Sequence, residues 1–480
     1  MAALDDRTPA VLDEVSRRDA ITRLRAQLGD ALEEDAAALD AMRADRSGWI
    51  ADGRPLAIVN ARDVSDVQAT MRLASEYRIP VVPRGAGTGL AGGANGTDGS
   101  IVLSVAAMNR VLEISAADEF AVVEPGVINT DLDEALAAHG LWFAPDPASK
   151  AISSIGGNIA TNAGGLLCVK YGVTREAVLG LTVVLADGRV LKTGHRTVKG
   201  VTGYDLTSLF VGSEGTLGVI VEATVRALPR PQGTTTTIGA LFPDVRSAAA
   251  ASASITAARL RPAVLELIDG LSLGAIRDYL GAHVLNESLG VEAGAAVDSA
   301  GSYLLVQFDA GTGEHVGERA VDLIRRDGGS PHITTDTDHG EQLLAIRRAS
   351  HPALSALGEV LIEDVAVPRS KMPQMFDAIA QISQRYGVPI PTVAHAGDGN
   401  LHPNFIHNGP EVPDAVWQAA GELFTAALRL GGTLTGEHGV GMLKRRWLRD
   451  ELGDDAYDLQ RRLKALFDPQ SILNPGKMFV

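Results

Sequence analysis

Glycine is concentrated in one short stretch of this chain, and that stretch restricts the folds open to it. Seven glycines fall within residues 85–99, shortly after the apolar pair Val81 and Val82. Glycine adopts positive φ and lets a ligand approach the main chain closely, but it loses more conformational entropy on folding than other residues. Successive N–H groups of such a loop can surround a pyrophosphate. We therefore interpret residues 85–99 as a nucleotide-binding loop rather than a glycine-rich surface turn.

Two well-known phosphate-binding motifs do not explain this loop. Gly87, Gly89 and Gly92 form a G-x-G-x-x-G, but a Rossmann glycine loop opens a helix, whereas this one runs toward an expected strand at 101–103. The pattern G-x-x-x-x-G-K-[ST] of P-loop proteins does not occur in the sequence. Two further blocks of glycine and small residues, 153–165 and 212–220, indicate a long ligand that meets the backbone at several points. A dinucleotide fits this pattern better than a single phosphate.

Length and composition exclude several classes of protein. A prior of about 150 residues per domain gives two or three domains for 480 residues. A net charge of −16 and 4% aromatic residues argue against a nucleic-acid-binding surface. Met1 to Arg7 lack the apolar core of a signal peptide, and no stretch of 18 apolar residues predicts a membrane span. The single cysteine, Cys168, allows no internal disulfide, so we expect a cytoplasmic protein.

The sequence predicts an α+β protein of two main domains. Residues 1–49 form an expected N-terminal helical extension, with helices in 10–47, and residues 50–230 the first domain, which ends at the prolines near 230. Its expected strands are 57–59, 81–82, 101–103, 121–124, 181–185 and 219–221, with helices at 64–77 and 131–139. Residues 231–440 predict a small sheet covered by helices on one side, with strands at 234–242, 264–268, 303–308 and 360–367 and a helix at 245–260. Residues 441–480 predict a C-terminal helix and an apolar tail that returns to the first domain.

Residues 392–405 carry a pattern typical of a metal-binding hairpin. A four-residue turn at 397–400 would place His395 opposite His402, with Asn404 on the same face. Opposed residues of a hairpin have Cβ atoms about 4.5–5.5 Å apart, so two imidazoles there could bind one metal ion.

A second segment, 435–439, holds Glu437 and His438 between glycines. Two histidines and one carboxylate leave coordination positions open for substrate, which is typical of catalytic metal sites. The alternative is a hydrogen-bonded polar cluster without metal.

Several of these motifs resemble a known flavoprotein superfamily. The segments 83–88 (PRGAGT), 145–149 (PDPAS), 155–165 and 212–218 (GSEGTLG) are similar to the FAD-binding half of the vanillyl-alcohol-oxidase/p-cresol-methylhydroxylase (PCMH) superfamily. That resemblance implies a PCMH-type FAD-binding domain of the α+β class, without a Rossmann unit, followed by an α+β cap domain with an antiparallel sheet. It also implies that residues 83–89 hold the FAD pyrophosphate, and that 145–165 and 212–220 lie along the rest of the cofactor.

The resemblance assigns cofactor contacts residue by residue. The expected FAD-binding residues are Pro83, Arg84, Gly85, Ala86, Gly87, Thr88, Gly89, Pro145, Asp146, Ser149, Ser154, Gly157, Asn158, Thr161, Asn162, Gly165, Glu214, Gly218, Val219, Ile220 and Asn474. Some relatives bond the flavin covalently through His or Cys. Residues 83–93 contain no histidine, and we interpret Cys168 as a small buried apolar residue, so the expected FAD is non-covalent.

The segments 395–402 (HAGDGNLH), 436–439 (GEHG) and the tail from Phe467 to Lys477 resemble the FAD-linked D-2-hydroxyacid dehydrogenases. This family includes D-lactate dehydrogenases, the flavin subunit of glycolate oxidase and D-2-hydroxyglutarate dehydrogenases, and the resemblance spans about 50–480. It implies oxidation of a D-2-hydroxy acid of the D-lactate or glycolate type to the 2-oxo acid, by hydride transfer to flavin N5. The expected active site lies where the FAD-binding and cap domains meet.

The same resemblance implies roles for particular side chains. His395, His402 and Glu437 would hold a divalent metal, expected to be zinc, and His438 would act as the base. Asn404 would make a polar contact with substrate, and Arg347 would bind the substrate carboxylate, since a planar guanidinium suits bidentate carboxylate binding. The alternative for Arg347 is a solvated charge on a helix.

Other functions on the same fold remain as alternatives. Hydroxyglutarate dehydrogenases carry a lysine near position 362 for a second carboxylate, where this chain has Ile362 and Glu363, so lactate or glycolate is favoured. A transferase of the alkyl-dihydroxyacetone-phosphate synthase type, a phenol oxidase and a subunit that binds FAD only for assembly or electron relay are the rivals. The histidine motifs argue against the last two. The electron acceptor is expected to be a quinone, a cytochrome or an electron-transfer protein, with peripheral membrane contact and a homodimer left open.

Overall fold

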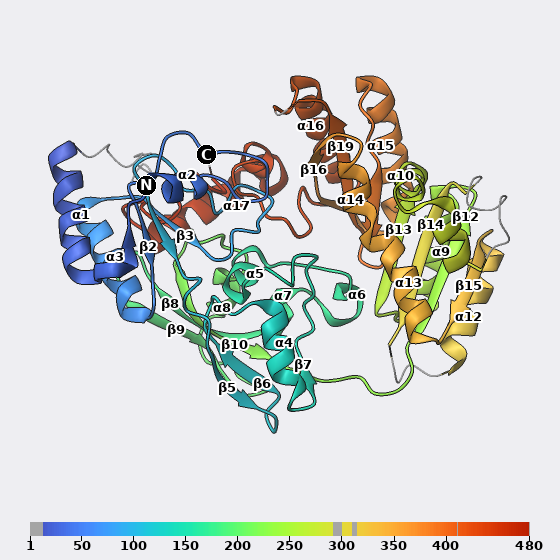
Figure 1. The fold of residues 1–480 in the computed structure, drawn as a ribbon, viewed down its shortest axis with the longest axis horizontal. Helices are drawn as coiled ribbons and strands as arrows, with labels where there is room; N and C mark the ends of the chain where they lie inside the picture. Colours follow the sequence, from blue (N-terminus) through green and yellow to red (C-terminus); the bar gives the residue numbers. More distant parts are fainter. Residues whose placement is uncertain (1–12, 291–299, 310–313, 410, 480) are drawn as a thin grey trace. The chain divides into compact units, whose positions relative to one another are not determined.

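The computed structural model describes residues 13–290, 300–309, 314–409 and 411–479, so the expectation for Met1 to Arg7 lies outside the described residues. The chain divides into two compact units (Figure 1). The first unit comprises Met1–Gly164, Gly172–Arg230 and Glu437–Val480, and the second comprises Gly165–Tyr171 and Pro231–Gly436.

The first unit contains two larger sheets and the helices that cover them. Its helices are α1 (Glu14–Leu28), η1 (Gly29–Ala31), α2 (Ala36–Ala41), α3 (Val64–Tyr77), α4 (Asn129–Ala137), α5 (Ile155–Thr161), α7 (Thr174–Ala177), α8 (Thr207–Phe210) and α17 (Arg445–Phe467), the last kinked at Gly453. Its strands are β1 (Leu32–Glu33), β2 (Ala57–Asn60), β3 (Val81–Arg84), β4 (Ile101–Ser104), β5 (Val111–Ser115), β6 (Phe120–Val123), β7 (Leu141–Trp142), β8 (Val178–Val184), β9 (Val190–Gly194), β10 (Val219–Arg226) and β11 (Leu228–Pro229).

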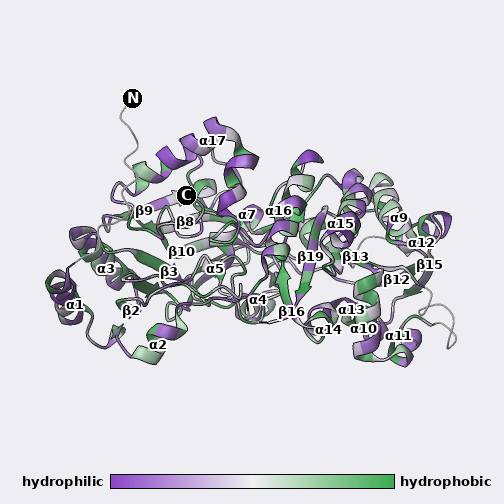
Figure 2. Ribbon diagram, turned by 90° about the horizontal axis from the view of Figure 1, so that it is seen from above, coloured by the Kyte–Doolittle hydropathy of each residue, from purple (hydrophilic) through white to green (hydrophobic). Residues whose placement is uncertain are grey.

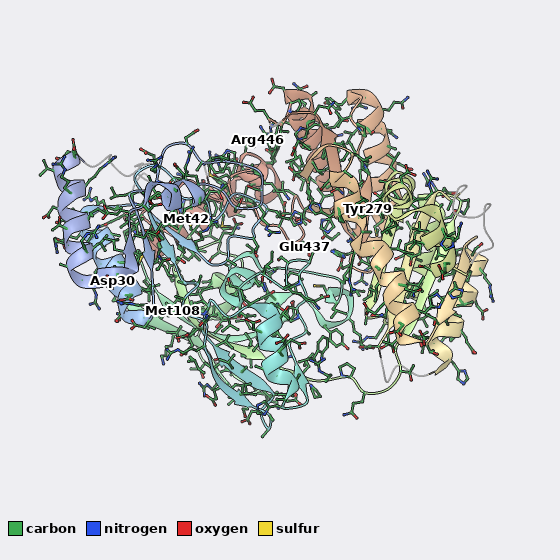
Figure 3. The ribbon with its side chains drawn as sticks, in the orientation of Figure 1. Asp30, Met42, Met108, Tyr279, Glu437 and Arg446 are labelled. Atoms are coloured by element: carbon green, nitrogen blue, oxygen red, sulfur yellow. The ribbon has the colours of Figure 1, made fainter. Side chains whose placement is uncertain are left out.

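The order of strands explains how the first unit presents its glycine loop. One sheet runs β1-β2-β4-β3, with β2 and β3 both parallel to β4, and the other runs β5-β6-β10-β8-β9 and is antiparallel. The glycine loop therefore leaves the end of an edge strand, β3, and returns into the central strand β4. Apolar side chains of α1, α3 and the first sheet pack together, and Met108, labelled in Figure 3, is fully buried among them.

The second unit is built on one antiparallel sheet, in which the order of the strands differs from their order in the sequence. Its strands are β12 (Thr236–Phe242), β13 (Val264–Asp269), β14 (Ser302–Phe308), β15 (Ser330–Thr334), β16 (Glu359–Ile362), β17 (Val365–Ala366), β18 (Thr392–His395) and β19 (Asn400–His407), in the order β15-β12-β14-β13-β18-β19-β16 with β17 also paired to β19. Its helices are α6 (Cys168–Tyr171), α9 (Val245–Ala257), α10 (Gly270–Leu280), α11 (Ala282–Ser288), α12 (Glu314–Arg326), α13 (Thr337–Arg348), α14 (Ser350–Ser355), η2 (Arg369–Lys371), α15 (Met372–Tyr386) and α16 (Asp414–Arg429).

The prediction that helices cover one side of this sheet is wrong, because both faces are covered. Gly239 of β12 faces Leu343 of α13, whereas Thr236 of the same strand meets Gly317 of α12. Residues an odd number of positions apart in a strand point to opposite faces, so α12 and α13 lie on opposite sides of the sheet.

Continuous apolar runs predicted the buried strands, but strands in which apolar and polar residues are mixed were not predicted. The strands expected at 57–59, 81–82, 101–103, 219–221 and 264–268 are all present, and the helix at 64–77 has the predicted bounds. The edge strands β5 and β9 were not predicted because none of their residues is buried and they contain no long apolar run. The strand expected at 360–367 is interrupted at Glu363 and Asp364, which separate β16 from β17.

Among the described residues, no helix is both long and apolar enough to cross a membrane. The longest, α17, is largely hydrophilic in Figure 2.

Candidate active site

The C-terminal tail holds the glycine loop of the first unit in place. Residues 472–474 run beside β3, where Val81 donates to the carbonyl of Ile472 at 2.7 Å and Asn474 donates to the carbonyl of Val81 at 2.7 Å. The Asn474 amide also donates to the carbonyls of Gly93 and Glu214, at 2.9 and 2.7 Å. The tail thus joins two glycine-rich segments that are far apart in the sequence.

Two cationic side chains, the buried Lys477 and the half-buried Arg84, lie against the same loop. Lys477, 2% exposed, donates from Nζ to the carbonyls of Gly93 and Asn95 at 3.1 and 3.0 Å, and burial lowers its pKa to about 8. Arg84 donates to the carbonyls of Ala94 and Ala44 at 2.8 and 2.9 Å, and burial likewise lowers its pKa. Buried cations favour a nearby anion, so this loop suits a ligand with phosphate charge.

The segment around α5 supplies polar groups that fit a cofactor. Ser154 caps α5, and its hydroxyl accepts hydrogen bonds from the N–H groups of Ala86 and Gly157, at 3.3 and 3.4 Å. A Cβ on Gly85 would collide with that hydroxyl, so the close approach requires glycine. Among the described residues, neither the buried Asn158 Nδ2 nor the buried Ser153 Oγ has a hydrogen-bond partner. Buried polar atoms of this kind need a ligand or water, and the segment therefore fits FAD.

Glu214 and the segment that follows Glu437 are tied together within the first unit. The buried Glu214 carboxylate accepts hydrogen bonds from the N–H groups of Val440 and Gly441 at 2.7 and 2.8 Å, while burial raises its pKa. Gly439, at φ +89, leaves room for the same carboxylate. Glu214 and Asn474 thus position backbone around the expected cofactor site.

The other residues predicted to bind FAD fall on the same unit, with one exception. Pro83 lies in β3, and Gly87 takes positive φ in the loop that follows. Gly157, Asn158 and Thr161 lie on α5, and Asn162 follows this helix in a left-handed conformation. Gly218 precedes Val219 and Ile220 of β10. Pro145, Asp146, Ser149, Thr88 and Gly89 lie in connecting segments. Gly165 instead begins the short segment 165–171 that belongs to the second unit.

In the second unit, the histidine hairpin forms with a different register from the predicted one. His395 pairs with Asn400, and His402 pairs with Val393, because the turn comprises residues 396–399 with Gly399 at φ +88. The two histidines are therefore diagonal rather than directly opposite. They share one face because His402 is two positions beyond Asn400, and their ring centroids are 5.0 Å apart with an 86° angle between the planes.

A buried carboxylate connects His395 with Arg347. Glu266 of β13 accepts a hydrogen bond from His395 Nδ1 at 2.7 Å and one from Arg347 Nε at 2.8 Å. The Arg347 side chain is 15% exposed, so it is not a solvated helix charge. No hydrogen bond from its two terminal nitrogens to a described residue is found, which leaves them available for a ligand carboxylate.

The tetrapeptide 436–439 is the chain link between the two units. In the second unit, Gly436 donates its N–H to Asp364 at 3.0 Å, and the same buried carboxylate accepts from Asn400 Nδ2 and Thr435 Oγ1. A Cβ on Gly436 would collide with the Asn400 amide. Glu437, labelled in Figure 3, is the next residue along the chain, and His438 follows it.

The described residues contain one cluster with a metal-binding donor set. The ligand atoms of His395, His402 and Glu437 all lie within 4.8 Å of one another. Two imidazoles and one carboxylate suit a divalent cation such as zinc and leave positions open. A carboxylate on the far nitrogen of a ligating histidine, here Glu266 on His395, is the usual arrangement at metal sites. The residues present therefore fit a metal ion.

Two other predicted residues have environments that narrow their roles. Asn404 donates from Nδ2 to the carbonyls of Pro391 and His402, at 3.2 and 2.7 Å, so only its Oδ1 could meet substrate. Cys168 is partly exposed rather than buried as predicted, and no residue of its short helix, α6, is buried.

Sequence reasoning missed three residues that organise these sites. Glu266 and Asp364 are carboxylates inside or beside apolar strands, and Lys477 is a lysine in an apolar tail. A charged residue within an apolar run is rarely buried without a partner, so that pattern was the available signal.

Comparison with known proteins agrees with this geometry. Residues 232–478 match the family described as "FAD linked oxidases, C-terminal domain", and residues 55–194 match "FAD binding domain". The chain is 43% identical over 432 residues to glycolate oxidase subunit GlcD of Bacillus subtilis, covering 88% of this chain and 89% of that protein. It is 32% identical over 480 residues to a D-lactate dehydrogenase of Anaerostipes hadrus, covering 98% and 97%.

The structure of p-cresol methylhydroxylase with substrate bound aligns with a TM-score of 0.78 at 17% identity, covering 98% of each chain. This likeness concerns the fold, and it confirms the predicted α+β, PCMH-type architecture.

Proposed function

Because the chain belongs to the FAD-linked oxidases, and is therefore an FAD-dependent oxidoreductase, we propose that it oxidises a D-2-hydroxy acid of the lactate or glycolate type to the 2-oxo acid. The observation that carries this proposal is that a single side chain links the expected carboxylate-binding residue, Arg347, to one of the expected metal ligands, His395. One carboxylate, Glu266, contacts both Arg347 and His395. A 2-hydroxy acid carries its carboxylate and hydroxyl on adjacent carbons, so it needs the two recognition groups close together.

Each residue then has a chemical role. The terminal nitrogens of Arg347 bind the substrate carboxylate through charge-assisted hydrogen bonds. His395, His402 and Glu437 hold the divalent cation, and residues 83–89 with the α5 segment hold FAD. Bound FAD would supply the acceptor for a hydride from the α-carbon, and a bound cation would favour loss of the hydroxyl proton. His438 accepts that proton, since an imidazole is suited to proton transfer near neutral pH.

The restriction to a single carboxylate follows from the environment of β16. Ile362 and Glu363 stand where a lysine would be needed to bind a second substrate carboxylate, and Glu363 is buried. The proposal therefore favours lactate or glycolate over 2-hydroxyglutarate. The electron acceptor for the flavin would be a quinone, a cytochrome or an electron-transfer protein.

An anaerobic absorbance titration of the purified protein tests the proposal. We expect D-lactate or glycolate to bleach the flavin band near 450 nm (a general flavin property) and L-lactate to leave it unchanged. A flavin that no 2-hydroxy acid reduces would contradict the proposed reaction and bring the transferase alternative to the front.

A further inference from the structure

Glu266 occupies a position that is costly for a carboxylate. It lies in the middle of β13, between β14 and β18, and is 1% exposed. Its neighbours in the strand, Leu265 and Leu267, are apolar and buried. A buried charge destabilises a fold unless charged or hydrogen-bonding partners compensate it, so the partners of Glu266 show what the residue does.

Each oxygen of Glu266 serves a different element. Oε1 accepts from His395 Nδ1 of β18 at 2.7 Å, and Oε2 accepts from Arg347 Nε of α13 at 2.8 Å. Glu266 and His395 are directly paired in the sheet, so their side chains project from the same face. Both partners belong to the site proposed above for substrate and metal.

A second carboxylate on the same strand, Asp269, has partners of a different kind. Asp269, three residues further along β13, accepts hydrogen bonds from the backbone N–H groups of Ser272 and Thr392, at 2.8 and 2.9 Å. It therefore fastens main chain, whereas the hydrogen bonds of Glu266 to described residues come from the side chains of His395 and Arg347. Within a single strand, Asp269 is thus a structural carboxylate, and Glu266 is a candidate for a positioning one.

We propose that Glu266 is a positioning residue that couples metal binding to recognition of the substrate carboxylate, an inference that rests on the proposed function. By accepting a hydrogen bond from His395 Nδ1, it makes Nε2 the nitrogen that coordinates the metal and fixes the plane of the ring. By accepting from Nε of Arg347, it restricts the guanidinium so that the substrate is bound end-on, through the two terminal nitrogens. Since one carboxylate orients both groups, each ligand should favour the binding of the other, and the coupling is reciprocal.

The Glu266→Gln variant tests this coupling in the full-length, FAD-loaded protein. Its amide oxygen can accept one hydrogen bond, but its NH₂ group faces the other donor. We expect the affinity for Zn²⁺, measured by equilibrium dialysis of metal-stripped protein, to fall about 10- to 100-fold. The FAD content should not change, because all the expected FAD-binding residues except Gly165 lie in the first unit.

Binding of pyruvate, the 2-oxo acid formed from lactate, measures the second half of the coupling. In the wild-type protein, Zn²⁺ should tighten pyruvate binding, followed through the perturbed flavin spectrum, and in Glu266→Gln this enhancement should fall toward one. The matched control is Asp269→Asn, which alters a carboxylate of the same strand and should retain the wild-type Zn²⁺ affinity. Wild-type Zn²⁺ affinity together with undiminished enhancement in Glu266→Gln would overturn the inference.

Two further arms keep the result unambiguous. If Glu266→Gln does not fold, Glu266→Asp retains the charge, but its carboxylate is one methylene too short to reach both donors. A folded Glu266→Asp protein with wild-type Zn²⁺ affinity and undiminished enhancement would equally overturn the inference. If wild-type flavin is not reduced by any 2-hydroxy acid while Glu266→Gln still loses Zn²⁺ affinity, the proposed function fails and the metal half of this inference stands.

Discussion

The glycine loop of the first unit offers mainly backbone groups to a ligand, whereas the histidine hairpin of the second unit offers side chains. The loop contributes backbone groups, and the residues that support it, Asn474 and Lys477, bond to its carbonyls. The hairpin contributes side chains, and its support, Glu266, bonds to another side chain. A backbone-built site should tolerate change in its side chains but not in its supports, whereas a side-chain-built site should fail at individual residues.

The largest effect is expected at His402, one of the three proposed metal ligands. His402→Gln should slow anaerobic reduction of the flavin by D-lactate about 10³-fold, because a bound cation contributes several kcal/mol to the reaction. FAD content should stay the same, since the change lies in the second unit. Stopped-flow absorbance measures the rate, and His407→Gln, on the same strand, is the matched control. Unaltered reduction by His402→Gln would remove the metal from the mechanism.

A backbone-fastening carboxylate of the second unit should affect stability and leave chemistry intact. Burial raises the pKa of Asp269 to about 6 from its ordinary 3.8, so between these values the folded state keeps a proton that the unfolded state has lost. The stability due to this proton is full below pH 4 and is lost as the pH rises through 6. We expect a decrease of about 2 kcal/mol, less than the full shift implies because the side chain is only partly buried.

Urea unfolding at several pH values between 4.5 and 7 measures this loss. Asp269→Asn cannot titrate and should lack this part of the pH dependence, although it also loses one backbone hydrogen bond. An identical pH profile in the two proteins would show that Asp269 ionises without cost.

Substrate recognition should depend on one arginine of the second unit. Arg347→Lys should lower kcat/KM for D-lactate about 10- to 100-fold, mainly through KM, because lysine cannot supply two parallel hydrogen bonds to a carboxylate. The neighbouring Arg348 pairs with Glu341 on the surface, and Arg348→Lys should leave steady-state kinetics unaffected. Equal behaviour of the two variants would show that Arg347 does not bind substrate.

The smallest predicted effect tests the supports of the backbone-built site. Lys477→Met removes the donor to the carbonyls of Gly93 and Asn95, and should weaken FAD binding about tenfold through a less ordered loop. Fluorescence titration of the apoprotein with FAD measures this affinity, and the exposed Lys199→Met of the same unit is the control. Zn²⁺ affinity should be unchanged, and a loss of metal instead of FAD would contradict the division between the two sites.

The sequence alone determined the features that depend on local spacing. Glycine clustering predicted the loop after β3, apolar runs predicted the buried strands, and the spacing of the two histidines predicted that they share a face. That last prediction survived a wrong register, because a shift of two positions along a strand preserves the face. The motifs also led to the family, which the comparisons confirm.

Tertiary structure alone decided which distant residues support those features. Glu266 is 129 residues from His395 and 81 from Arg347, and Asn474 is 381 residues from Gly93. Periodicity carries no information about such pairs, because it reports only which residues share a face of one element. A buried carboxylate can bond to side chains, as Glu266 does, or to main chain, as Asp269 does on the same strand, and the elements packed against it decide which.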